Sequence, residues 1–275
     1  FESLGIFRTA VELDSSDTSH IKFLAWVPIC EWEDKDLEAL VLHLHPLADF
    51  FSFKIPAPDI IQIADEDWSN SWKKHWKPDP VGINFLVLPA WLDIPLEFSS
   101  RVVLRLDPGS AFGTGSHPST RLCLEAIEKF PMFEKTVADI GCGSGILTLA
   151  ALKKGAKKVF ATDIDSLAVK STSNNVILNN LDNNKIQVDL GSINELERSL
   201  CKSKVDLLLC NILAPVIEEL APKFNDIIAP NGIGLLSGIL TTQIPALQNS
   251  LNSLGWKIEN SFKKEKWSLL TIKRF

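Results

Sequence analysis

The sequence lacks several features that would assign it to a specialised class of protein. No uncharged apolar run approaches the roughly eighteen residues of a membrane span, and Glu2 and Arg8 interrupt any signal-peptide pattern at the start. The five cysteines include no C-x-x-C pair. We therefore expect neither a disulfide framework nor a zinc site, and we predict a reducing, cytoplasmic compartment. Because the only methionine is Met132, we expect further residues before Phe1.

Charge is unevenly spread along the 275 residues. Residues 1–60 hold eleven acidic and four basic side chains, a net charge of −7, whereas residues 101–275 hold seventeen acidic and twenty-one basic side chains, a net charge of +4. One interpretation is a solvated acidic face. The other is an N-terminal module that attracts a basic protein by long-range steering. Such a module would repel nucleic acid, so we expect no direct nucleic-acid binding. Without a membrane-length apolar run, we also expect no membrane partner.

The apolar pattern divides the chain into three regions, 1–58, 59–78 and 79–275. The first region reads as two strands followed by a helix, which predicts a small α+β module. The third alternates strands with helices, which predicts a parallel sheet covered on both faces. Its last two strands have no helix between them, which favours an antiparallel final pair. The expected strands are 8–13, 21–27, 85–88, 102–106, 136–140, 158–163, 186–190, 205–210, 234–237, 256–259 and 268–273, and the expected helices are 34–44, 65–77, 117–130, 146–154, 166–179, 216–228 and 243–254.

The linker region 59–78 carries three tryptophans at helical spacing. Trp68, Trp72 and Trp76 lie along one face of the expected helix. They form either a platform for a ligand or, as we expect, a stripe that packs on a neighbouring domain. Pro78 and Pro80 end this helix.

A glycine loop follows the apolar strand 136–140, and a helix begins immediately after it. The loop is Gly141-Cys142-Gly143-Ser144-Gly145. Glycines let a backbone approach a ligand closely, and a helix start offers unpaired N–H donors. Asp163 ends the next strand, where its carboxylate can accept hydrogen bonds from both hydroxyls of an adenosine ribose. The alternative for Asp163 is a cap of the following helix.

Two details distinguish the possible cofactors, because NAD and S-adenosylmethionine share that ribose. The pyrophosphate fingerprint needs a third glycine where this sequence has Ile146. Asp139, two residues before the first glycine, would repel a pyrophosphate but suits a cationic methionine group. S-adenosylmethionine is therefore the predicted cofactor, and an NAD-dependent oxidoreductase is the alternative.

Two further segments are expected at the same crevice. Asn211 follows the strand 205–210, where its oxygen can accept a hydrogen bond from a substrate nitrogen; the alternative is a helix cap. The segment Asp107–Thr120 has three glycines in seven residues before a helix start, which is typical of a flexible loop that could fold over the cofactor. Within it, Phe112 either stacks on a ligand or packs in the core. His117 is expected to order the helix start rather than to act as a base.

Taken together, these motifs resemble the ribosomal protein methyltransferase family PrmA, whose members methylate the eleventh protein of the large ribosomal subunit. The resemblance rests on Asp107–Thr120, Asp139–Gly145 and Asn211-Ile212-Leu213. It also includes Trp68-x-x-x-Trp72-Lys73, Pro89-Ala90-Trp91 and Leu236-Ser237-Gly238-Ile239-Leu240. It runs from about residue 65 to the C-terminus, whereas residues 1–60 match weakly.

The resemblance implies a class I (Rossmann-like) S-adenosylmethionine-dependent methyltransferase domain over 79–275. A linker would join it to an N-terminal, ferredoxin-like substrate-recognition domain that is incomplete at its start. The implied methyl acceptors are lysine side chains and an N-terminal α-amine, and no metal is expected. A methyltransferase acting on another substrate and a non-catalytic binding module remain alternatives. Carried over by position, the cofactor-binding residues are Thr120, Gly141, Gly143, Asp163 and Asn211, of which Asn211 is also the predicted catalytic residue.

Overall fold

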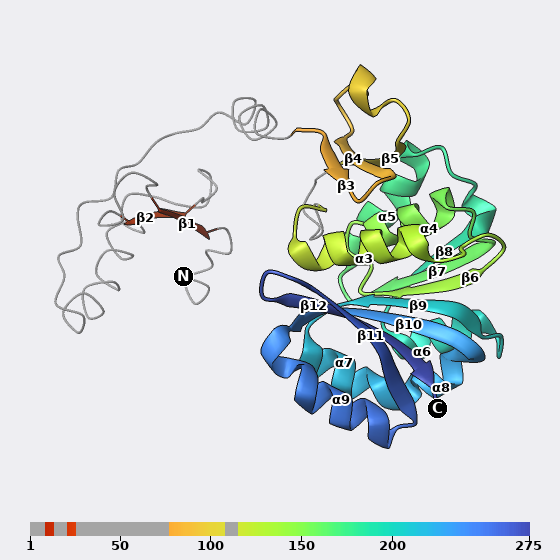
Figure 1. Ribbon diagram of the computed structural model, residues 1–275. Helices are drawn as coiled ribbons and strands as arrows, with labels where there is room; N and C mark the ends of the chain where they lie inside the picture. The colour runs from red at the N-terminus through yellow and green to blue at the C-terminus, as the bar shows by residue number, and fades with distance from the viewer. Residues whose placement is uncertain (1–8, 14–20, 26–76, 108–114) are drawn as a thin grey trace, which may run out of the picture. The chain divides into compact units, whose positions relative to one another are not determined.

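The computed structural model describes residues 9–13, 21–25, 77–107 and 115–275 (Figure 1). The chain divides into two compact units, Phe1–Ser69 and Asn70–Phe275. In the first unit β1 (Thr9–Leu13) and β2 (Ile21–Ala25) lie within the two predicted strands and pair antiparallel. The predicted helix over 34–44 and the tryptophan stripe of the linker lie outside the described residues.

The second unit is built on a seven-stranded sheet in the order β11-β12-β10-β9-β6-β7-β8. From β10 to β8 all neighbouring strands are parallel. β12 pairs antiparallel with β10 and with β11, so the predicted antiparallel final pair is confirmed. The bounds are β6 Thr136–Ile140, β7 Lys158–Asp163, β8 Ile186–Leu190, β9 Val205–Asn211, β10 Ile228–Leu240, β11 Trp256–Lys264 and β12 Trp267–Arg274.

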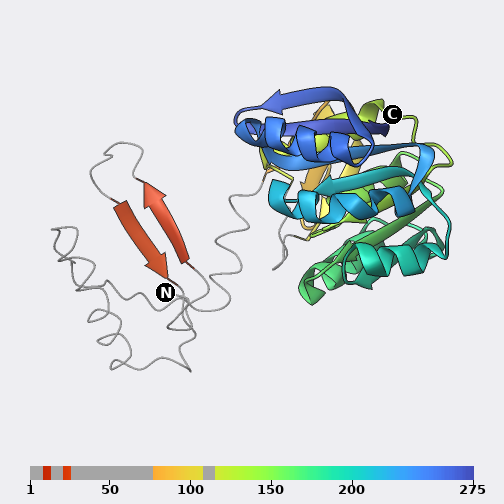
Figure 2. The same cartoon turned by 90° about the horizontal axis from the view of Figure 1, so that it is seen from below.

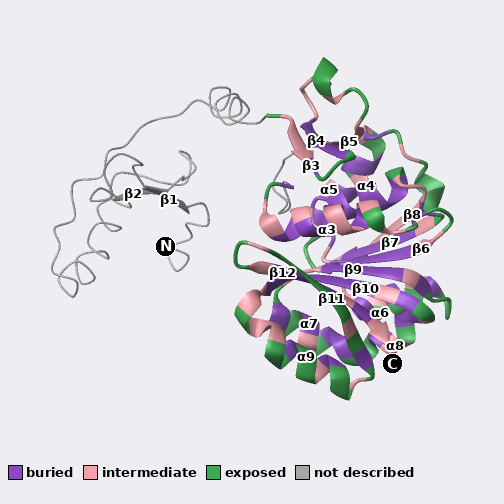
Figure 3. Cartoon of the chain, in the orientation of Figure 1, coloured by how far each residue is buried: buried purple, intermediate pink, exposed green. Residues whose placement is uncertain are grey.

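Helices cover both faces of this sheet (Figures 1 and 2). Strand side chains alternate between the faces, so Val137 joins one hydrophobic core and Ala138 the other. Figure 3 shows the central strands almost entirely buried between the two layers. One layer holds α3 (Pro118–Lys129), α4 (Ile146–Lys153) and α5 (Ser166–Leu178), and the other holds α6 (Ile193–Leu200), α7 (Ala214–Leu220), α8 (Phe224–Ile227) and α9 (Ile244–Ser253).

A small three-stranded sheet is fixed to α3 by two acidic side chains. It contains β3 (Asp79–Val81), β4 (Phe85–Pro89) and β5 (Val102–Leu106) in that order. Arg121 of α3 donates to both carboxylate oxygens of Asp79 at 2.8 and 2.6 Å. The Glu128 carboxylate, near the end of α3, accepts the backbone N–H groups of residues 83, 84 and 85. These contacts hold β3 and β4 against α3.

Two helical segments differ from the prediction. The single helix expected over 216–228 is wrong: α7, a 3-10 turn (Ala221–Lys223) and α8 take its place, and β10 already begins at Ile228. Pro222 lies inside the turn, where its missing N–H and its ring interrupt a helix. The prediction also missed α6, which begins with a Ser192–Glu195 capping box. Within the described ranges, no helix is long and apolar enough to cross a membrane.

Candidate active site

The predicted site residues meet at one edge of the central sheet. β6 ends at Ile140, β7 at Asp163 and β9 at Asn211. Because β6 pairs in parallel with both β7 and β9, their carboxyl ends lie at the same edge. This edge is where open parallel sheets bind their ligands. The structure therefore brings the glycine loop, Asp163 and Asn211 together.

The glycine loop has a backbone that only glycine adopts without strain. Gly141, Gly143 and Gly145 have φ angles of 72°, 55° and 79°. A Cβ atom on Gly141 would lie 2.5 Å from Cγ2 of Ile212. Gly145, the N-cap of α4, has no side chain to cap that helix. The first N–H groups of α4 thus face the carboxyl edge without a side-chain cap.

Asp163 is held at the edge by backbone donors. Its Oδ2 accepts the N–H of Gly143 at 2.9 Å, and its Oδ1 accepts the N–H of Asp165 at 3.0 Å. Each carboxylate oxygen keeps a second lone pair, which suits the two hydroxyls of a ribose. The side chain that caps α5 is Asp165, which accepts the N–H of Leu167. The alternative of Asp163 as the helix cap is therefore wrong.

Asp139 lies beneath the glycine loop and is only 1% exposed. Its Oδ2 accepts the hydroxyl of Thr148 at 2.7 Å, and its Oδ1 has no hydrogen-bond partner in the described part of the chain. Burial raises the pKa of Asp139 to about 6, although the bonds from Thr148 oppose this rise. The negative charge of a buried carboxylate attracts a cation at the loop. Asp139 can therefore stabilise a cationic methionine group without touching it.

Asn211 is oriented by a buried threonine on α3. Its Nδ2 donates to Oγ1 of Thr120 at 3.2 Å, and Thr120 is 2% exposed. Among the described residues, no group donates a hydrogen bond to Oδ1 of Asn211, so this oxygen remains available as an acceptor. The N-cap of α7 is Leu213, and the alternative of Asn211 as a helix cap is therefore wrong.

The segment Leu236–Leu240, which the sequence singles out only by resemblance, lies in β10 beside the end of β9. Ser237 is fully buried, and its hydroxyl lies within hydrogen-bonding distance of the carbonyls of Ser119 and Ser268. Gly238 has a φ of 81° at a shift in register between β10 and β12, where a Cβ would collide with the backbone of Ile212. Ile212 is thus packed against Gly238 as well as Gly141.

His117 begins α3 as expected. Its Nδ1 accepts the N–H of Ser119 as the N-cap, and its ring meets Trp267 edge-on at 4.7 Å between centroids. The predicted loop over the cofactor, residues 108–114 with Phe112, lies outside the described residues.

Three exposed apolar side chains at this edge escaped the sequence reasoning. Ile164 follows Asp163 and is 83% exposed, Leu190 ends β8 at 56%, and Leu213 follows the Asn211-Ile212 pair at 62%. The signal was an apolar residue placed directly at or after a strand end. Exposed apolar side chains of this kind are suited to packing against the flat ring of a nucleobase.

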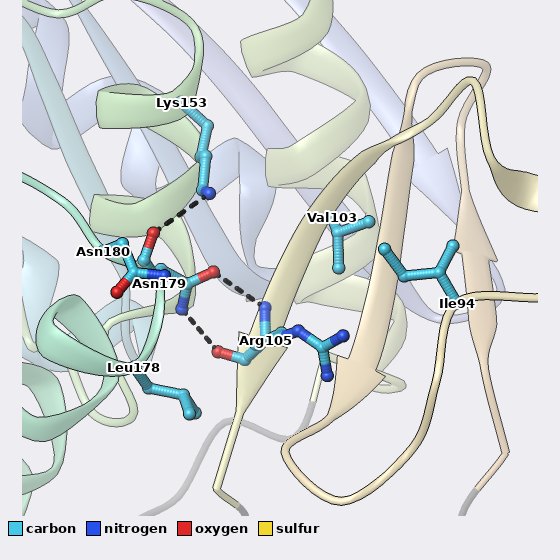
Figure 4. Close-up of a pocket in the computed structure, with 7 residues that line it drawn as sticks. All are labelled: Ile94, Val103, Arg105, Lys153, Leu178, Asn179 and Asn180. Carbon is cyan, nitrogen blue, oxygen red and sulfur yellow. Dashed lines mark hydrogen bonds between the residues drawn. The ribbon is translucent and has the colours of Figure 1, made fainter.

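A cavity of about 200 Å³ lies elsewhere. Arg105, Lys153 and Asn180 are among the residues that line it (Figure 4). Lys153 is the last residue of α4, and Asn180 follows the end of α5. Both helices begin at the glycine-loop edge, so this cavity lies at their opposite ends and is separate from the candidate site.

Comparisons with known proteins point to one family. The family model described as ribosomal protein L11 methyltransferase (PrmA) matches residues 17–275. A ribosomal protein L11 methyltransferase of Prochlorococcus marinus (strain MIT 9313) is 51% identical over 271 residues, covering 98% of this chain and 90% of that protein. One of Parasynechococcus marenigrum (strain WH8102) is 50% identical, covering 98% and 94%. The crystal structure of ribosomal protein L11 methylase from Lactobacillus delbrueckii subsp. bulgaricus is 32% identical with a TM-score of 0.65, covering 72% of this chain and 99% of that one.

Proposed function

Because this chain belongs to the ribosomal protein L11 methyltransferase (PrmA) family and is an S-adenosylmethionine-dependent methyltransferase, we propose that it methylates lysine side chains and the N-terminal α-amine of ribosomal protein L11. The observation that carries the proposal is the meeting of the glycine loop, Asp163 and Asn211 at one carboxyl edge. Family membership also removes the NAD-dependent oxidoreductase alternative.

The residues at this edge fit the cofactor. Asp163 would accept the ribose hydroxyls, and the backbone at Gly141 and Gly143 would pass close to the methionine part. Thr120 and Asn211 would complete the site next to the transferred group. The adenine ring of the cofactor would lie against apolar side chains such as Ile164. When bound, S-adenosylmethionine supplies an electrophilic methyl group on a sulfonium.

The acceptor amine must be neutral to attack. At pH 7 a lysine with a pKa of ~10.4 needs roughly 4.6 kcal/mol to lose its proton, and an α-amine of ~7.8 needs about 1 kcal/mol. Asp139 is too buried to take this proton, and burial raises the pKa of the Cys142 thiol, so that group stays neutral. We infer that solvent accepts the proton and that Asn211, through Oδ1, orients the amine. The rate gain then comes mainly from alignment.

Replacing Asn211 with Ala tests this role. We expect kcat to fall at least tenfold while the Kd of S-adenosylhomocysteine, measured by calorimetry, changes less than threefold. The reason is that the amide oxygen aims the acceptor rather than holding most of the cofactor. Unchanged turnover in the variant would rule out Asn211 as an orienting group.

Peptide mapping of methylated L11 by tandem mass spectrometry tests the acceptor chemistry. The proposal expects methyl groups on lysine Nζ atoms and on the N-terminal nitrogen. Methyl groups on carboxylates, arginines or glutamines instead would contradict amine methylation while leaving the methyltransferase in place.

The proposal also covers domain organisation and location. Residues 1–58 would recognise the substrate, 59–78 would link, and 79–275 would carry out transfer. The acidic balance of residues 1–60 supports recognition of a basic ribosomal protein. We place the reaction in the cytoplasm, in line with the cysteine pattern of the sequence and with a ribosomal protein as the substrate.

A further inference from the structure

The inner face of α5 carries polar side chains in a layer that is otherwise apolar. Thr172, Asn175 and Asn179 are 0%, 1% and 5% exposed. Their spacing of three and four residues places them on one side of the helix. Buried amides and hydroxyls cost free energy unless they are hydrogen-bonded. The hydrogen-bond partners of these three side chains therefore indicate the role of this face of α5.

Asn175 uses both ends of its amide, on two segments distant in sequence. Its Nδ2 donates to the carbonyl of Ser144, in the glycine loop, at 2.9 Å. Its Oδ1 accepts the N–H of Asp107, directly after β5, at 2.9 Å. Asp107 opens the stretch that leads to Thr120. One buried side chain thus joins the glycine loop to the residue that follows β5.

A neighbouring side chain holds the adjacent peptide of the loop. The hydroxyl of Thr172 donates to the carbonyl of Gly143 at 3.0 Å. Two successive loop carbonyls, those of Gly143 and Ser144, are therefore turned toward α5. Because a trans peptide points its N–H opposite to its C=O, this directs the Ser144 N–H away from α5. The two bonds to α5 therefore fix the orientation of this part of the loop.

We propose that Asn175 is a positioning residue for cofactor binding: it fixes the glycine loop and ties that loop to Asp107 at the end of β5. The inference rests on the proposed function only in taking the glycine-loop edge as the cofactor site. It does not depend on L11 as the substrate. Asn175 itself acts through the loop and through Asp107.

Asn179 provides a matched control on the same helix (Figure 4). Its Oδ1 accepts the N–H of Arg105 at 3.0 Å, and its Nδ2 donates to the carbonyl of Arg105 at 2.7 Å. It therefore pairs with β5 as a neighbouring strand would. Among its described contacts none reaches the glycine loop. Asn179 thus shares the burial of Asn175 and also bonds to the carbonyl of Asn175, but it has no direct bond to the loop.

The test compares Asn175→Ala with Asn179→Ala in the full chain, by calorimetric titration with S-adenosylhomocysteine and by urea unfolding. Both variants lose stability, because each loses buried hydrogen bonds. We expect Asn175→Ala to raise the Kd at least tenfold and Asn179→Ala to change it less than twofold. Equal changes in Kd for the two variants, or none in either, would overturn the proposal.

Asn175→Asp is the second variant, in case the alanine variant does not fold. It keeps the acceptor for the Asp107 N–H but places an oxygen against the Ser144 carbonyl. We expect its Kd for S-adenosylhomocysteine, and its KM for S-adenosylmethionine, to rise at least tenfold at pH 8 with kcat reduced less than threefold. A wild-type Kd would refute the role of the loop contact. If the wild-type chain binds the cofactor normally but does not methylate L11, the proposed substrate is wrong, whereas the positioning role of Asn175 is unaffected.

Discussion

Asp139 shows how burial changes the chemistry of a single residue. Burial raises its pKa from 3.8 to about 6, so the folded chain holds this proton more tightly than the unfolded chain. The stabilisation from this proton is complete below pH 4 and is lost as the pH rises through 6. We expect the wild type to lose up to about 3 kcal/mol relative to Asp139→Asn between pH 4 and pH 7.

Urea unfolding of the cofactor-free wild type and of Asp139→Asn at several pH values measures this difference. Comparing the two chains cancels the titration of groups that do not interact with Asp139. Parallel stability curves from pH 4 to pH 7 would show that Asp139 titrates as an ordinary exposed carboxyl.

Replacing Gly141 tests whether the backbone shape of the glycine loop matters for cofactor binding. Gly141→Ala places a Cβ 2.5 Å from Ile212 Cγ2 at a φ of 72°, so the loop has to move. We expect the Kd of S-adenosylhomocysteine to rise at least tenfold. Gly255→Ala is the control, since Gly255 also has a positive φ, 84°, but a Cβ there meets nothing within 4 Å. If both variants bind like the wild type, the close approach of the loop to Ile212 is irrelevant to binding.

The sequence predicted the residues whose chemistry is local and missed those whose partners are distant. Glycines between a strand and a helix, and an acid at the next strand end, carry their meaning within a few residues. Asn175 reads as an ordinary polar residue, because its partners lie 31 and 68 residues away. No short-range pattern reveals such contacts, although the polar run in α5 was an available signal.

At the scale of elements, α3 clamps the small sheet to the large one through Glu128. Its carboxylate accepts three backbone N–H groups of the β3–β4 turn. Glu125, one turn earlier, forms an ion pair with Lys264 in which each side chain is about one-third exposed. We expect Glu128→Ala to lower the free energy of unfolding by about 2 kcal/mol and Glu125→Ala by less than ~1 kcal/mol, as measured by urea denaturation. Equal losses would contradict the clamp.

Element predictions succeeded where hydrophobic pattern and length agreed. β5, β6, β7 and β8 have the bounds that the sequence predicts. The helix over 216–228 failed at Pro222, where the chain keeps turning but changes its hydrogen bonding. α6 was missed because only three of its eight residues are buried. Its signals, apolar residues at helical spacing and a Ser192–Glu195 capping box, were present in the sequence but span only eight residues.

At the scale of the whole molecule, the opposite charges of residues 1–60 and 101–275 predict dependence on salt. If the acidic module attracts a basic substrate, the KM for L11 rises about tenfold between ~50 and ~300 mM salt, because screening shortens the reach of the field. The KM for S-adenosylmethionine, a small ligand held by local contacts, changes less than twofold. Steady-state kinetics measure both values. An L11 KM that is independent of salt would favour the simpler interpretation of a solvated acidic face.

The central claim is that this chain transfers methyl groups from S-adenosylmethionine to ribosomal protein L11. The most direct measurement is intact-mass spectrometry of L11 after incubation with this chain and S-adenosylmethionine, with cofactor binding measured in parallel. The account predicts that L11 gains the mass of whole methyl groups, and that the gain disappears when the chain or the cofactor is omitted. Unchanged L11 in the presence of a chain that binds the cofactor would contradict it, and would leave a methyltransferase of this fold with a different substrate or a binding module without activity.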